Sequence, residues 1–207
     1  MSTPELSDQP EEWPVSATRD LHRGDWVVAL RADDVRRPGD PDGEPFTRFV
    51  LEHPGAVVVL AIDDDERVLC LWQYRHAARH RLVELPAGLC DAEGEEPLDV
   101  ARRELREEAL LEASEWTHLT SVWPSPGITA EVQHLYLARG LREVDRGDFV
   151  LEHEEADMTT AWVPFADLLA AVLAGRVADA PLVTAILAAQ ARGLAGSERS
   201  TSRGGQR

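Results

Sequence analysis

Three glutamates, Glu104, Glu107 and Glu108, stand close together in a segment whose apolar residues recur at helical spacing. On a helix, positions i, i+3 and i+4 share one face, so the three carboxylates lie side by side. Like charges at this spacing destabilise an isolated helix by about 0.2–0.5 kcal/mol per pair. A cation between the carboxylates offsets that cost, and hard divalent cations such as Mg²⁺ prefer oxygen ligands. The spacing therefore indicates a divalent-metal site, with a solvated charged helix face as the alternative.

The glutamates belong to an acidic chain of 207 residues, long enough for one domain with an appendage. The formal net charge of −17 argues against nucleic acids and anionic membrane surfaces as partners. No apolar run reaches the length of a membrane span, and residues 1–12 lack the basic and apolar segments of a secretory signal. Cys70 and Cys90 form no metal-binding spacing. We therefore expect a cytoplasmic protein with reduced thiols.

The order of the expected elements predicts a mixed α/β (α+β) fold, in which helices cover the faces of a mixed sheet. We expect a disordered leader at residues 1–12, a β region with a hairpin at 13–53, the main domain at 54–192 and a disordered tail at 193–207. The expected strands span residues 26–30, 46–51, 56–62, 67–75, 81–84, 118–123 and 132–137, and the expected helices span 97–111, 164–174 and 181–192.

A glycine-containing loop precedes the glutamate-bearing segment at a defined distance. Six residues separate Gly88 from Glu95, and seven more lead to Arg103-Glu104-Leu105-Arg106-Glu107-Glu108. This pattern resembles the signature of the Nudix hydrolase family, Gly-x5-Glu-x7-Arg-Glu-U-x-Glu-Glu-x-Gly-U, where U is aliphatic. The chain departs from it by one additional loop residue and by Leu110 in place of the last glycine. Because glycine near a helix end usually supplies a left-handed cap, we expect this helix to continue or to end differently.

Membership of the Nudix family would imply an α/β/α sandwich with a mixed sheet and a catalytic Mg²⁺, which Mn²⁺ can replace. By resemblance, Glu104 and Glu108 are the leading metal ligands, Glu107 lies in or beside the cluster, and Ala87 contributes its carbonyl oxygen. Arg103 is expected beside the catalytic carboxylates. The same resemblance implies that Arg103, Gly88 and Glu95 hold the loop against the helix.

Beyond this motif the chain is similar, over about residues 13–192, to actinobacterial ADP-ribose pyrophosphatases. The segments that carry this similarity are Gln73-Tyr74-Arg75-His76, residues 84–89, Pro126-Gly127 with Glu131, and residues 153–158. The similarity implies a homodimer that exchanges its N-terminal strands and cleaves ADP-ribose to AMP and ribose 5-phosphate. It also implies that Glu155, in a late loop, helps to activate the attacking water.

The substrate contacts implied by the resemblance involve arginines and aromatic side chains. The chain has no lysine, so arginine, backbone amides or metal must meet the phosphates. Arg75 is the first candidate for a phosphate contact, and Arg48 is a weaker one. The candidates for stacking on adenine are Trp26, Phe46 and Phe49, and Glu131 is a candidate for contact with the distal ribose.

Two other functions are compatible with the motif. One is a Nudix pyrophosphatase for another nucleoside diphosphate derivative, such as a sugar nucleotide, because the motif describes only the bond that is broken. The other is a Nudix ligand sensor without catalysis, which Leu110 favours. The complete set of carboxylates argues for activity.

Overall fold

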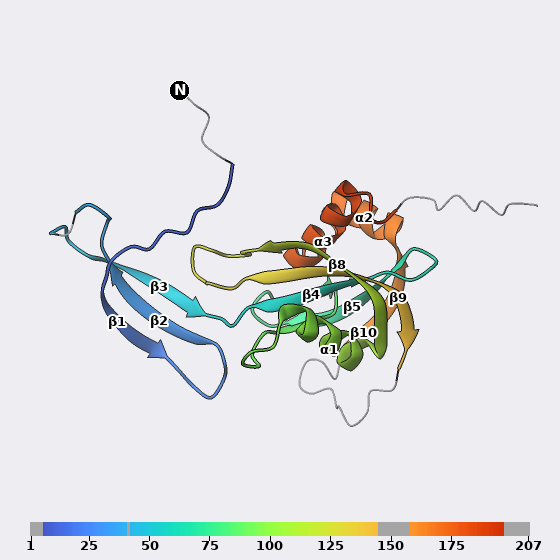
Figure 1. The fold of residues 1–207 in the computed structure, drawn as a ribbon, viewed down its shortest axis with the longest axis horizontal. Coiled ribbons are helices and arrows are strands. Elements are labelled where there is room, and N and C mark those ends of the chain that lie inside the picture. Colours follow the sequence, from blue (N-terminus) through green and yellow to red (C-terminus); the bar gives the residue numbers. More distant parts are fainter. Residues whose placement is uncertain (1–5, 41, 145–157, 197–207) are drawn as a thin grey trace, which may run out of the picture. The chain divides into compact units, whose positions relative to one another are not determined.

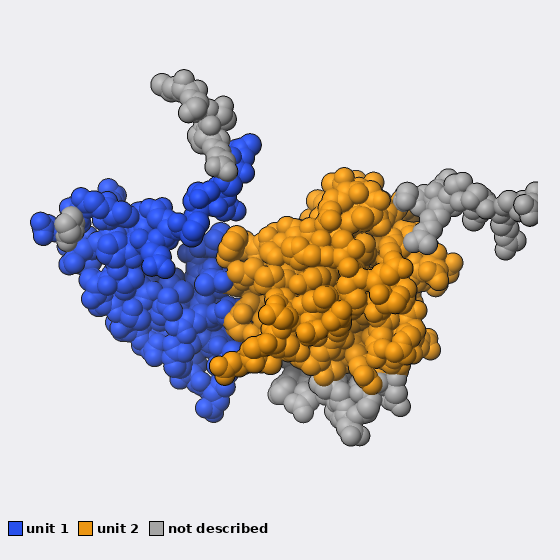
Figure 2. Space-filling model, viewed as in Figure 1, with its two compact units in different colours: residues 1–53, 125–130 blue, residues 54–124, 131–207 orange. Residues whose placement is uncertain are grey.

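A computed structural model describes residues 6–40, 42–144 and 158–196, and these residues fold into two compact units (Figure 1). Unit 1 comprises residues 1–53 and 125–130, and unit 2 comprises residues 54–124 and 131–207, as coloured in Figure 2. No pattern in the sequence predicted that residues 125–130 belong to the N-terminal unit. In unit 1, the Leu51 amide donates to the Ile128 carbonyl oxygen at 2.7 Å.

Unit 1 is a three-stranded antiparallel sheet in the order β1-β2-β3. The strands are β1 (Val15–His22), β2 (Ala29–Val35) and β3 (Phe46–Glu52). The pairing of β2 with β3 confirms the expected hairpin, although β2 begins three residues later than expected. Trp26 lies before it in the β1–β2 connection and is 70% exposed. Strand β1 was not predicted, because it is exposed along its whole length and has no buried face to create an apolar pattern.

Unit 2 contains a mixed four-stranded sheet, β7-β4-β9-β8, and an antiparallel three-stranded sheet, β10-β5-β6. Strand β4 is parallel to β9, and the other pairs are antiparallel. The strands are β4 (Ala56–Ala61), β5 (Arg67–Arg75), β6 (His80–Glu84), β7 (Ala87–Leu89), β8 (Leu111–Val122), β9 (Gln133–Glu143) and β10 (Thr159–Pro164). The helices are α1 (Pro97–Ala109), α2 (Phe165–Leu173) and α3 (Ala180–Ala191).

The central strand β4 is buried along its whole length, and its side chains alternate between two cores. Val57 and Val59 pack in one cluster with Leu105 of α1. Val58 and Leu60 pack in the other cluster, to which α2 and α3 contribute. The sheet therefore lies between α1 on one face and α2 with α3 on the other, which confirms the α/β/α sandwich.

Helix α1 begins and ends sharply. Pro97 occupies its first turn, where a missing backbone N–H costs nothing. The helix ends at Ala109, and Leu110 adopts a left-handed conformation with φ 56° and ψ 37°. The expectation that leucine would change the helix end is therefore wrong, because Leu110 takes the conformation that glycine usually supplies. Leu111 follows at once as the first residue of β8, with its side chain in the core.

The segment after α3 packs against unit 2 as far as the structure describes it. Ala195 is 3% exposed, and the Leu194 carbonyl oxygen accepts a hydrogen bond from Arg139 at 2.9 Å. The Gly196 amide donates to Glu66 at 3.2 Å. Residues 193–196, which we expected within a disordered tail, are therefore held in place, and the rest of that tail lies outside the described residues. Residues 6–12 of the expected leader are described and exposed, without regular secondary structure.

Candidate active site

The carboxylates of α1 face strand β7. Glu108 is 9% exposed and accepts a hydrogen bond from the Ala87 backbone amide at 3.0 Å. Ala87 lies in an extended segment directly after Leu85-Pro86, and the Pro86 carbonyl oxygen accepts from the Val59 amide at 2.8 Å. Backbone pairing to β4 therefore fixes β7, and Glu108 fixes α1 to β7.

Gly88 is required by the position of Glu104. A Cβ atom placed on Gly88 would overlap the Glu104 carboxylate, so the side chain of Glu104 lies directly against the β7 backbone. The Glu104 side chain is 12% exposed. The approach of this carboxylate to the backbone explains the glycine at this position in physical terms. Glu104 and Glu108 therefore both meet the short strand that contains Ala87.

Arg103 joins the loop before α1 to the carboxylate face. Its guanidinium lies 2.7 Å from Glu104, 3.4 Å from Glu107 and 3.4 Å from Glu95. Glu95 belongs to the loop, whereas the other two glutamates belong to α1. One arginine thus offsets part of the repulsion between the α1 carboxylates and ties the loop to the helix.

These donors fit a hard divalent cation, because the carboxylates of Glu104 and Glu108 lie against the β7 backbone, Glu107 contacts the same arginine as Glu104, and the glycine leaves room for Glu104. Within the described ranges, no three His, Cys, Asp or Glu side chains form a ready metal-binding group. In the present arrangement Glu108 bonds to the Ala87 amide and Glu104 bonds to Arg103. The residues therefore suit Mg²⁺ by donor chemistry, and ligation requires the carboxylates to exchange some of these partners.

A second charged cluster lies at the ends of β5 and β6. Arg75 donates from Nε and Nη2 to Glu84 at 2.9 Å and 2.6 Å. Glu84 is buried, with 7% of its side chain exposed, whereas Arg75 is half-exposed at 49%. Asp179 caps the N-terminus of α3 by accepting from the Leu182 amide at 3.0 Å. Burial, together with the charge of Glu84, raises the pKa of Asp179 to about 6. No pattern along the chain indicated that Glu84 and Asp179 would join Arg75.

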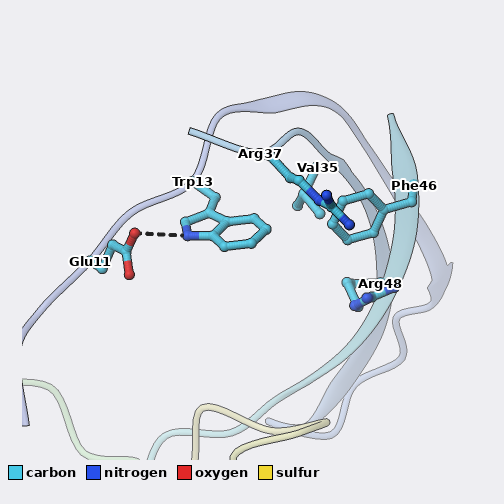
Figure 3. A pocket seen from close by; sticks show the side chains of 6 residues that line it. All are labelled: Glu11, Trp13, Val35, Arg37, Phe46 and Arg48. Carbon is cyan, nitrogen blue, oxygen red and sulfur yellow. Dashed lines mark hydrogen bonds between the residues drawn. The ribbon is translucent and has the colours of Figure 1, made fainter. Parts of the chain in front are cut away.

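Unit 1 contains a hollow of about 490 Å³ (Figure 3). Trp13 and Phe46 lie on its sides with ring centroids 6.3 Å apart and planes at 85°. The Arg48 guanidinium carbon lies 4.3 Å from the centre of the Phe46 ring. The residues lining the hollow are Glu11, Trp13, Val35, Arg37, Phe46 and Arg48. Two aromatic faces beside two guanidinium groups form a surface that suits a flat ring attached to an anion.

Of the candidates for stacking on adenine, Phe46 lines the hollow. Phe46 and Arg48 line it as a pair, one residue apart on the same side of β3. Trp26 and Phe49 do not line it, and Phe49 is 55% exposed on the other side of the strand. Sequence reasoning missed Trp13 because its place beside Phe46 depends on how the chain enters β1.

Two further candidates lie elsewhere. Glu131, in unit 2, accepts a hydrogen bond from Gln133 at 2.8 Å. Glu155 lies outside the described residues.

Comparisons with known proteins confirm the resemblance noted in the sequence. Residues 52–185, more than half of the chain, match the family model of the NUDIX domain. An ADP-ribose pyrophosphatase of Mycobacterium tuberculosis is 46% identical over 171 residues, which cover 83% of this chain and 80% of that protein. A methanol dehydrogenase activator of Bacillus methanolicus is 38% identical over 132 residues, covering 64% and 69%.

A crystal structure of an ADP compounds hydrolase has the same fold. It superposes with a TM-score of 0.71 at 19% identity and covers 91% of this chain and 98% of that one. The docking of the carboxylate helix on β7 agrees with the matching family model and with the relative at 46% identity. The chain belongs to the Nudix hydrolase family.

Proposed function

We propose that this Nudix hydrolase cleaves the diphosphate of ADP-ribose to AMP and ribose 5-phosphate in an Mg²⁺-dependent reaction. The observation that carries the proposal is the docking of Glu104 and Glu108 on β7, which gathers the carboxylates of the motif around one backbone segment. The similarity to a mycobacterial ADP-ribose pyrophosphatase over four fifths of both chains supports the choice of substrate.

In this proposal Glu104, Glu107, Glu108 and the Ala87 carbonyl oxygen hold Mg²⁺, which Mn²⁺ can replace. The metal supplies charge neutralisation on the diphosphate and a more acidic water. Arg103, paired with Glu95, keeps the carboxylates in place, and their 3.4 Å contact supports this role.

The remaining steps concern the substrate. Arg75 binds a phosphate oxygen through its guanidinium. Glu155 accepts a proton as the water oxygen attacks phosphorus, the P–O bond of the anhydride breaks, and the departing phosphate retains the bonding electrons. Glu131 contacts the distal ribose.

We further propose that unit 1 recognises the adenine. The hollow beside Phe46 and Arg48 supports this role, with Trp13 added to the candidates of the sequence. Trp26 and Phe49 are exposed, and β1 is exposed throughout, which supports a homodimer in which unit 1 of one protomer serves its partner. A side chain such as Phe49 then becomes buried on assembly.

We also propose a cytoplasmic location. Cys70 and Cys90 are free thiols, and burial raises the pKa of Cys70 to about 12, as expected of an unreactive reduced cysteine. Over the part of the chain that the structure describes, no helix combines the length and apolar character of a membrane span.

The alternatives differ in what they predict for Leu110 and for substrate choice. Leu110 would support a non-catalytic sensor only if it altered the end of α1. The left-handed cap is retained, so that support is absent. Another nucleoside diphosphate derivative, such as a sugar nucleotide, would use the same carboxylates.

A substrate panel separates these functions. The purified protein with Mg²⁺ is offered ADP-ribose, sugar nucleotides, dinucleotides and nucleoside triphosphates at equal concentrations. We expect the highest kcat/KM for ADP-ribose. A higher kcat/KM for a sugar nucleotide would replace the proposed substrate, and ligand binding without turnover of any compound would favour a sensor.

A further inference from the structure

The side chain of Arg75 forms its ion pair with a residue that is not opposite it in the sheet. Strands β5 and β6 are antiparallel, and the register sets Arg75 against His80 and Leu71 against Glu84. Arg75 and Glu84 are therefore separated by four residues along either strand. The arginine side chain nevertheless reaches back to Glu84 and forms a bidentate contact, with Nε and Nη2 both donating. The position of the guanidinium is thus set by Glu84 and not by the pairing of the strands.

The two partners of this contact differ in burial, because Glu84 is buried and Arg75 is half-exposed. A buried carboxylate is costly unless it is paired, and breaking such a pair leaves an uncompensated charge. Glu84 satisfies its charge with the Nε and Nη2 edge of Arg75, so that Nη1 is the guanidinium nitrogen not used in the pair. The fork therefore holds the Nε and Nη2 edge of the arginine on the buried Glu84, while about half of the arginine side chain remains exposed.

The anchored arginine lies within the field of the carboxylate helix. The hydrogen bonds to Glu84 raise the pKa of Arg75 most strongly, and the charges of Asp179 and Glu108 raise it further. Glu84 itself stands three residues before Ala87, whose amide holds Glu108. One short segment, residues 84–87, thus places both the guanidinium and a carboxylate of the motif.

We propose that Glu84 is a positioning residue, which acts through Arg75 by orienting its guanidinium toward the diphosphate of the substrate. This inference rests on the proposed function, in which Arg75 binds phosphate. A structural ion pair alone would stabilise the protein without changing substrate binding. The two roles differ in whether Glu84 matters to the enzyme once Arg75 is absent.

A double-mutant cycle tests the proposal with Glu84→Gln, Arg75→Gln and the two combined, assayed with ADP-ribose and saturating Mg²⁺. The charge-assisted fork is stronger than a neutral hydrogen bond, so we expect Glu84→Gln to raise KM about 10-fold and to change kcat less than about 3-fold. Arg75→Gln should raise KM at least as much. In the Arg75→Gln background, Glu84→Gln should add less than about a 2-fold change.

The outcomes separate the inference from the function on which it rests. Equal losses from Glu84→Gln with and without Arg75 would overturn the positioning role, because Glu84 would then act independently. Normal kinetics in Arg75→Gln would instead remove Arg75 from the proposed phosphate site. No turnover of ADP-ribose by the wild-type protein would reject the proposed function.

Arg75→Gln strands the Glu84 charge and could prevent folding, so a second measurement uses Glu84→Gln alone. Calorimetry in Mg²⁺ should show about 10-fold weaker binding of ADP and unchanged binding of adenosine, because only ADP has a diphosphate. Equal weakening of both ligands would contradict the proposal. Glu66→Gln is the matched control, because it removes the carboxylate of another Arg–Glu pair in unit 2, at 2.8 Å from Arg139. Its KM and ADP affinity should stay at the wild-type values.

Discussion

Replacement of Leu110 by glycine measures the strain at the end of the carboxylate helix. A left-handed conformation costs a residue with a side chain about 1–2 kcal/mol, and Leu110 has φ 56°. Leu110 belongs to neither core cluster but is partly buried, so Leu110→Gly also removes some apolar contact. Glycine removes the strain but adds about 0.5–1 kcal/mol of backbone entropy to the unfolded chain.

Alanine provides the reference, because it keeps the Cβ atom and loses the leucine side chain. We expect Leu110→Gly to be more stable than Leu110→Ala by about 1 kcal/mol, or about 2–4 °C in Tm for a chain of this size. Urea and thermal unfolding followed by circular dichroism measure the difference, without Mg²⁺ so that metal binding does not contribute.

Ala109→Gly is the control for Leu110→Gly, because residue 109 is still helical and glycine there should destabilise by about 1 kcal/mol. If Leu110→Gly were no more stable than Leu110→Ala, the left-handed cap would not be the feature that strains this helix end.

Three other predictions concern the site, stability and the hollow. Gly88→Ala should displace the Glu104 carboxylate, which is a flexible group, so we expect a stability loss below about 1–2 kcal/mol. Activation by Mg²⁺, measured by metal titration of the rate, should be about 10–100-fold weaker. Unchanged activation would show that Glu104 does not bind the metal. The folded-state pKa of Asp179 is raised from 3.8 to about 6, so the stabilisation from its protonated form is complete below about pH 4 and is lost as the pH rises through about 6. The pKa shift corresponds to about 3 kcal/mol at most. After allowing for solvent, we expect Asp179→Asn, which keeps the cap, to be about 1 kcal/mol more stable than the wild-type protein at about pH 7.5 and equally stable at about pH 4. Equal stability of the two proteins at both pH values would contradict this expectation. Phe46→Ala should raise KM for ADP-ribose about 10-fold by removing a stacking face, whereas Phe49→Leu should change the KM of a monomer little and that of an exchanged dimer more.

The elements with one strong local signal could be predicted from the sequence. Strand β4 is a continuous apolar run because both of its faces are buried, and α1 combines Pro97 with an apolar stripe at Ala101 and Leu105. A mixed sheet with helices on its faces followed from the order of such elements, whereas the α/β/α sandwich was implied by the resemblance to the Nudix family. Strand β1 could not be predicted in this way, because a strand exposed on both faces carries no alternation.

The site likewise contains one part that local sequence predicts and another part that it does not. The grouping of Glu104, Glu107 and Glu108 is a matter of helical spacing, which the sequence contains directly. The contact of Arg75 with Glu84 joins two residues that are four positions apart in the strand register, through a side chain that reaches along the sheet. Asp179 joins them from the start of α3, a helix far along the chain from both strands, and such contacts follow only from the packed fold.

The role of the α1 carboxylates in metal-dependent cleavage is tested by the Mg²⁺ dependence of AMP release from ADP-ribose, compared between the wild-type protein and Glu108→Gln. The glutamine amide in this variant retains an oxygen that can accept from the Ala87 backbone N–H, so circular dichroism should show an intact fold. We expect Mg²⁺-dependent formation of AMP and ribose 5-phosphate by the wild-type protein and almost no turnover by the variant. Wild-type rates in Glu108→Gln, or AMP release that does not depend on a divalent metal, would contradict the assignment of these carboxylates to a catalytic metal.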